Sequence, residues 1–162
     1  ILPYLKKDKH IVFDFSDCAR RGTRELLGML DIVGKFATQL PVTLSMNENE
    51  AYAILNALGI DEKPMEKSGE ALRQKLSVEN IVWHFRDDIW GFTREGIHHF
   101  LIYKIEKPAI VTGAGDNFNA GLSLGLLAEL SMEEAILAAS FTASYYVCYG
   151  HSPSIDNLID FI

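Results

Sequence analysis

Short apolar runs alternate with segments of helical periodicity along the first half of the chain, and this alternation limits the possible folds more than any other feature. The runs are five or six residues long, as buried strands are, and the segments between them are long enough for helices. The predicted order is strand 10–15, helix 23–40, strand 42–46, helix 48–58, helix 65–76 and strand 80–85. Strands that alternate with helices in this way form a mostly parallel sheet covered by helices.

The pattern changes after the third strand. Residues 89–93 and 97–103 are predicted to form two antiparallel strands, because the short segment Arg94-Glu95-Gly96 between them is suited to a tight turn. An extended connection with Pro108 follows, and helices are predicted at 116–130, 132–149 and 155–162. The expected fold is therefore a layered α/β domain with an antiparallel addition near one edge of the sheet.

The length of the chain favours one domain. With 162 residues, of which 48% are hydrophobic, the chain can bury one core, and a second full domain would not fit comfortably. We therefore expect a single α/β domain over residues 1–162. The sequence begins Ile1-Leu2-Pro3 without an initiating Met and has the pattern of the middle of a fold, so we expect a portion of a longer protein.

The charge and the cysteines argue against several classes of partner. The chain has 15 Lys and Arg residues and 22 Asp and Glu residues. The resulting net charge of -7 disfavours binding to nucleic acids or anionic membranes. No segment approaches the ~18 apolar residues of a membrane span, and no leader pattern is present. Cys18 and Cys148 lack zinc-site or disulfide spacing, which fits a reducing cytoplasm.

A glycine-rich turn before an apolar helix is the main candidate for a catalytic site. Its sequence is Thr112-Gly113-Ala114-Gly115-Asp116. Glycines let the backbone turn tightly and point free N–H groups at one place, and the N-terminus of a helix adds partial positive charge. Such a turn is suited to hold a phosphoryl group, and an ionised Asp116 beside it is suited to accept a proton from an attacking hydroxyl.

Other interpretations of this turn are less specific or fail. A dinucleotide fold needs a third glycine where Phe118 stands, and a Walker loop needs a Gly-Lys-Ser/Thr sequence that is missing. The simplest alternative is a plain turn that Asp116 caps.

A second candidate site is the pair Asn47 and Glu50, three residues apart at the start of a helix that follows a strand. Hard oxygen ligands on one face suit Mg²⁺, usually through retained waters. The same spacing is also that of a capping box, in which each residue bonds to the backbone of the other. From the spacing alone, both roles remain open.

Residues 111–121 read Val-Thr-Gly-Ala-Gly-Asp-Asn-Phe-Asn-Ala-Gly, and these eleven positions resemble the signature D-T-x-G-A-G-D-x-F-x-A-G of the ribokinase-like, or PfkB, carbohydrate kinases. Asn47-Glu48-Asn49-Glu50 also looks like the N-x-x-E motif of that family. The resemblance implies a three-layer αβα fold that lacks its N-terminal half and lid. It further implies an ATP-dependent, Mg²⁺-requiring kinase that acts on a sugar.

The resemblance also implies roles for individual residues. Asp116 would be the catalytic base, Gly113, Ala114 and Gly115 the anion hole, and Asn47 and Glu50 the metal-organising pair. Four residues would contact the nucleotide, namely Thr112, His84, Arg86 and Ser140. Ser140 stands where many relatives have Asn.

The nucleotide turn departs from the family pattern. Arg86 and Ile89 stand where the family has glycines. Either these side chains crowd the nucleotide, or Arg86 contacts a phosphate, or the segment is a solvated turn. The alternatives to a sugar kinase are a non-catalytic ligand-binding relative and a nucleoside or vitamin kinase of the same superfamily. We expect a cytoplasmic protein, with a homodimer as a possible assembly, whose 162 residues are inactive alone.

Overall fold

The computed structural model describes residues 4, 6, 9–61, 63–102 and 104–162. This part of the chain divides into two compact units. The first unit holds the residues up to Phe85 together with Trp90–His98, and the second holds Arg86–Ile89 with His99–Ile162. The expectation of a single domain stays a prediction.

Within the described residues, five strands form one mixed sheet in the order β1-β2-β3-β4-β5. Their bounds are β1 (Ile11–Phe13), β2 (Val42–Met46), β3 (Asn80–His84), β4 (Asp88–Phe92) and β5 (Ile97–Leu101). The first three strands are parallel, with Ile11 opposite Val42 and Thr43 opposite Asn80. A tight turn joins β4 to β5, and there Thr93 N–H donates to Gly96 O over 3.0 Å. The parallel sheet with a hairpin at one edge is as the sequence predicts.

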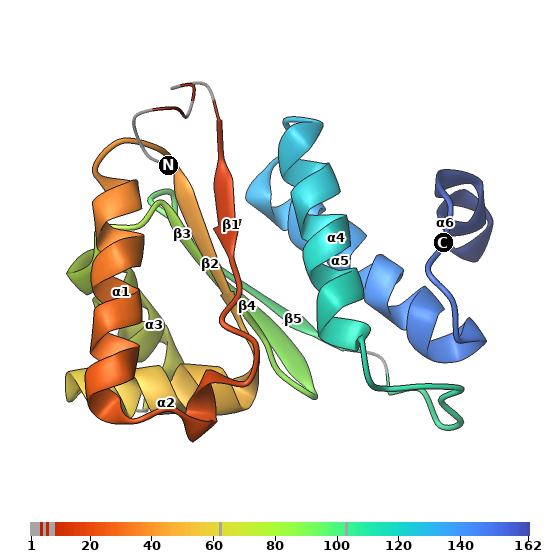
Figure 1. Cartoon of the computed structure of the whole chain (residues 1–162). Helices are drawn as coiled ribbons and strands as arrows, with labels where there is room; N and C mark the ends of the chain where they lie inside the picture. Colours follow the sequence, from red (N-terminus) through yellow and green to blue (C-terminus); the bar gives the residue numbers. More distant parts are fainter. Residues whose placement is uncertain (1–3, 5, 7–8, 62, 103) are drawn as a thin grey trace. The chain divides into compact units, whose positions relative to one another are not determined.

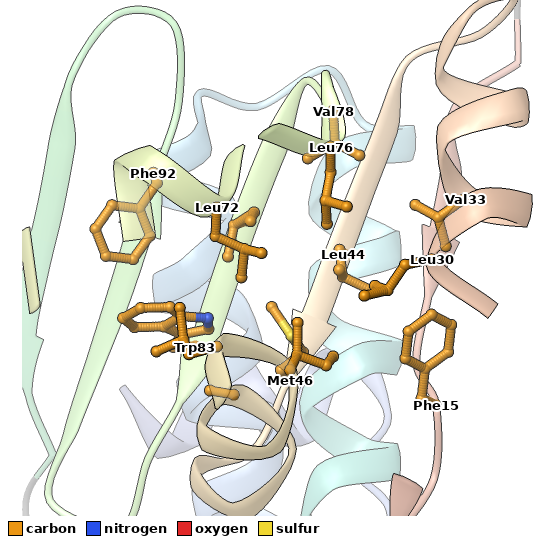
Figure 2. Packing of buried hydrophobic residues seen from close by; sticks show 14 of the residues in the cluster. Phe15, Leu30, Val33, Leu44, Met46, Leu72, Leu76, Val78, Trp83 and Phe92 are labelled. Carbon is orange, nitrogen blue, oxygen red and sulfur yellow. The ribbon is translucent and has the colours of Figure 1, made fainter. Parts of the chain in front are cut away.

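Three helices gather on one side of β1–β3 in the first unit (Figure 1). They are α1 (Thr23–Ala37), α2 (Glu48–Leu58) and α3 (Met65–Leu76). Figure 2 shows Leu44 and Met46 of β2 among side chains from α1 and α3. The hydrophobic side chains Leu30, Val33, Leu44, Met46, Leu72, Trp83 and Phe92 belong to this core. Because connections between parallel strands must cross over the sheet, these helices are placed to cover its apolar face.

The second unit is built around two helices that follow one another. These are α4 (Ala114–Leu127) and α5 (Met132–Tyr149), and the short α6 (Ile155–Phe161) follows them. Ser131 begins α5 through a capping box with Glu134, whose backbone N–H donates to Ser131 Oγ over 3.3 Å. In the described part of the chain, no helix has both the length and the apolar character needed to cross a membrane.

Several element boundaries differ from the sequence predictions. β1 ends at Phe13 because the chain turns away there: Ser16 and Asp17 are left-handed, and Ser16 N–H donates to Asp14 Oδ1 over 2.7 Å. β5 ends at Leu101. α4 begins two residues earlier than predicted, at Ala114, and ends at Leu127, shortly before Glu129 adopts φ 57°.

Candidate active site

The glycine-rich turn forms the N-terminus of α4 in the second unit. Gly113 is the N-cap residue, with φ 95°, a left-handed backbone conformation that favours glycine. A Cβ atom at this position would lie 2.8 Å from Tyr146 Oη, so space as well as conformation requires glycine. Among the residues that the structure describes, no side-chain hydrogen bond caps this helix end. Its first N–H groups are thus available to something other than a capping side chain.

The N–H groups of the turn do not all remain available. Ala114 N–H donates to Val111 O over 3.0 Å, so the Ala114 amide is not free, contrary to the sequence prediction. The N–H groups of Gly113, Gly115 and Asp116 have no acceptor among the residues that the structure describes. Three donors rather than four are therefore open for an anion at this helix N-terminus.

Asp116 lies in the first turn of α4 and is exposed. Its carboxylate makes no hydrogen bond or ion pair within the described ranges. A free, exposed carboxylate therefore stands next to three unpaired N–H donors, an arrangement that can bind an anion and accept a proton.

Two residues outside the sequence-predicted site hold the turn. Asn117 donates twice to Gly113 O, from its backbone N over 3.1 Å and from Nδ2 over 3.0 Å. Tyr146 of α5 donates from its hydroxyl to Thr112 O over 3.0 Å. Asn117 could have been found from its place next to Asp116, whereas nothing in the local sequence links Tyr146 to the turn.

Asn47 and Glu50 lie in the first unit, at the carboxyl end of β2, and form a capping box. Asn47 Oδ1 accepts from Glu50 N–H over 3.0 Å, and Glu50 Oε2 accepts from Asn47 N–H over 2.9 Å. Glu50 Oε1 accepts from Asp17 N–H over 2.9 Å, and only 1% of Glu50 is exposed. Glu50 thus ties the turn after β1 to the start of α2.

Burial shifts the proton affinity of the groups around Glu50. Burial raises the pKa of Glu50, the charge of Asp14 adds to this rise, and the backbone N–H groups of Asn47 and Asp17 oppose it. Burial and the charge of Glu50 raise the pKa of the Cys18 thiol to about 11. Cys18 is therefore protonated near neutral pH and unsuited to act as a nucleophile.

The side-chain oxygens of Asn47 and Glu50 already have hydrogen-bond partners within the protein. Both carboxylate oxygens of Glu50 already accept backbone N–H groups, and so does Asn47 Oδ1. No group of three His, Cys, Asp or Glu side chains suited to a metal occurs within the described part of the chain. The capping role that the spacing allowed is the one seen, and the metal-organising role of Asn47 and Glu50 stays a prediction.

The raised pKa of Glu50 leads to a prediction about stability. The folded protein binds a proton at Glu50 more readily than the unfolded chain, so Glu50 lowers stability as the pH rises from ~4.3 through its raised pKa. The quantity to follow is the unfolding free energy of the wild type minus that of Glu50→Gln. We expect this difference to fall over this pH range, by at most ~1.4 kcal/mol per pH unit. Urea unfolding at a series of pH values measures this difference.

The matched control for this prediction is Glu48→Gln. Glu48 is exposed in the same first turn of α2, so the control removes one charge without touching the capping box. A difference that instead rises with pH would mean that the two backbone hydrogen bonds outweigh burial at Glu50.

The predicted nucleotide contacts are divided between the two units. His84 ends β3 in the first unit, and burial lowers the pKa of its imidazole to about 4, so it is neutral at pH 7. Arg86, Thr112 and Ser140 belong to the second unit; Arg86 and Thr112 are exposed and Ser140 is half-buried in α5. Ile89 is 1% exposed within β4, so the expectation that it lies in the nucleotide turn is wrong.

Known proteins are similar to this chain in sequence and in fold. A ketohexokinase of Haloferax volcanii is 22% identical over 148 residues, which are 91% of this chain and 40% of that protein. A ribokinase of Thermotoga maritima matches with a TM-score of 0.69 at 21% identity, over 94% of this chain and 55% of that one. A nucleoside kinase of Methanocaldococcus jannaschii, an archaeal member of the ribokinase family, has the same TM-score and identity, over 93% and 46%.

The mixed sheet and the helices of the described residues thus match the ribokinase-like αβα fold. The chain spans about 40% of the length of the curated ketohexokinase that it matches. The family model of prokaryotic ketohexokinases matches residues 1–162, which is the whole chain. The chain therefore belongs to the prokaryotic ketohexokinase family, within the ribokinase-like (PfkB) carbohydrate kinases.

Proposed function

We propose that the protein transfers the γ-phosphoryl group of ATP to a hydroxyl of a sugar or related small molecule. The observation that carries this proposal is the N-terminus of α4, where three free backbone N–H groups lie beside the exposed Asp116. Phosphoryl transfer needs positioning and charge stabilisation more than covalent help from the protein, and this arrangement offers both.

In the proposed reaction, Asp116 accepts the proton of the acceptor hydroxyl while the hydroxyl oxygen forms a bond to the γ-phosphorus. The bond between the γ-phosphorus and its bridging oxygen breaks, and ADP leaves with the electron pair. The N–H groups of Gly113, Gly115 and Asp116 stabilise the negative charge that spreads over the phosphoryl oxygens. The dipole of α4 acts in the same direction.

The family match narrows the choice of phosphoryl acceptor. Its model describes ketohexokinases, so we propose a ketohexose as the first acceptor to test. A nucleoside is the second, because a nucleoside kinase shares this fold. We propose that ATP binds as its Mg²⁺ complex, in which the phosphates would hold most of the metal's coordination.

The test is a phosphoryl-transfer assay on the longest natural protein that carries this chain. ADP release is measured with ATP and Mg²⁺ in the presence of fructose, ribose or adenosine, and a calorimetric titration measures ATP binding separately. We expect ADP release that depends on one of these acceptors. ATP binding without turnover on any of them, or no ATP binding at all, would favour a non-catalytic relative.

A further inference from the structure

The peptide between Thr112 and Gly113 depends on a side chain of another helix. Tyr146 lies in α5, 34 positions further along the chain, and its hydroxyl donates to Thr112 O over 3.0 Å. The neighbouring peptide groups have other partners: Gly113 O accepts from Asn117, and Ala114 N–H donates to Val111 O. Within the described residues, the carbonyl of Thr112 has Tyr146 as its one hydrogen-bond donor.

This single contact controls the direction of a proposed catalytic donor. In a trans peptide the C=O and N–H bonds point to opposite sides, so a hydrogen bond that fixes Thr112 O also fixes Gly113 N–H. Gly113 has no Cβ to restrict rotation of this peptide, and φ 95° shows that it uses the freedom of glycine. A partner for Thr112 O is therefore needed if Gly113 N–H is to keep one direction.

Tyr146 also limits the position of the turn. A Cβ built on Gly113 would meet Tyr146 Oη at 2.8 Å and Cζ at 3.2 Å, so the phenol ring lies directly against the glycine. A second link ties the same stretch to α5, because Ala109 N–H donates to Val147 O over 2.8 Å. The segment before α4 is thus fastened to the C-terminal part of α5 at two points.

We propose that Tyr146 is a positioning residue of the anion hole, which aims Gly113 N–H at the transferring phosphoryl group. This inference rests on the proposed function and adds to it a residue outside the glycine-rich turn. Tyr146 does not touch the reacting atoms. It acts through the Thr112–Gly113 peptide, and its loss should lower the rate of transfer more than the binding of the acceptor.

The test compares Tyr146→Phe with the control Tyr149→Phe, in the longest natural protein that carries this chain. Phe keeps the ring contact with Gly113 and removes only the hydroxyl, and Tyr149 lies one turn further along α5 with an exposed ring. We expect kcat to fall about tenfold in Tyr146→Phe with KM for the acceptor changed less than about twofold, the effect of one lost hydrogen bond. Tyr149→Phe should match the wild type.

A second measurement does not depend on turnover. The NMR order parameter of the Gly113 N–H should be lower in Tyr146→Phe than in the wild type, because the peptide can rotate once it loses the hydroxyl, and it should be unchanged in Tyr149→Phe. If the wild type lacks kinase activity, the proposed function fails, while the order parameter of Gly113 still decides whether Tyr146 holds the peptide. An order parameter and a kcat in Tyr146→Phe that both equal the wild-type values would overturn the proposal.

Discussion

Asp116→Asn is expected to lower kcat for phosphoryl transfer at least about 10³-fold and to leave the fold intact. Loss of a general base typically costs 10²–10⁴-fold, and Asp116 is the free carboxylate at the N-terminus of α4. Asn has the same shape but cannot accept the hydroxyl proton. Because no described residue pairs with Asp116, the substitution breaks no contact in the protein. Steady-state ADP release and thermal unfolding measure the two effects.

The matched control is Asp156→Asn. Asp156 is an exposed acid in the first turn of α6, so the control removes the same charge from a comparable position in another helix of the second unit. It should change kcat less than about twofold. If Asp116→Asn kept its activity within about tenfold of the wild type, Asp116 would not be the base.

The sequence predicts those parts of the fold whose signals are local. Strand 42–46 and helix 48–58 are correct to the residue, because Asn47 caps the helix and Gly59 ends it with φ 65°. The early end of β1 was missed, because it depends on the left-handed turn at Ser16 and Asp17. Neither residue is a glycine, so the sequence carries no strong sign of that conformation.

In the candidate site, too, the sequence predicts what depends on local signals and misses what depends on distant contacts. The spacing of Asn47 and Glu50 fits both a metal pair and a capping box, and the structure shows the capping box, in which Glu50 accepts from two backbone N–H groups. One of these belongs to Asp17, 33 positions away. Tyr146 lies 34 positions from Thr112 in the sequence. Contacts over such distances are set by packing, which a local pattern does not report.

The position of the glycine-rich turn depends on close contact between α4 and α5. Gly121 and Gly125 lie four residues apart on α4, and sequence spacing places them on one face of the helix. A Cβ on Gly121 would lie 2.7 Å from Ala139 Cα, and one on Gly125 would lie 2.7 Å from Ala135 Cα. The backbones of the two helices therefore approach so closely that only glycine fits between them.

Replacing either glycine by alanine is expected to destabilise the second unit, although alanine is the better helix former. Helix propensity alone would stabilise the protein by ~0.5–1 kcal/mol. The close approach at Ala139 and Ala135 reverses the sign, because backbone atoms cannot yield as a flexible side chain can. We expect Gly121→Ala and Gly125→Ala each to lower the unfolding free energy by ~1–3 kcal/mol, the usual cost of overpacking. Urea unfolding measures this loss.

Gly28→Ala provides a control with the opposite sign. Gly28 lies within α1, and nothing lies within 4 Å of a Cβ built on it, so only helix propensity acts there. This variant should gain ~0.5–1 kcal/mol under the same conditions. Because α4 carries Asp116 and α5 carries Tyr146, separation of these helices should also weaken the hydrogen bond that holds Thr112. If alanine raised the unfolding free energy at all three glycines, α4 and α5 would not pack backbone to backbone.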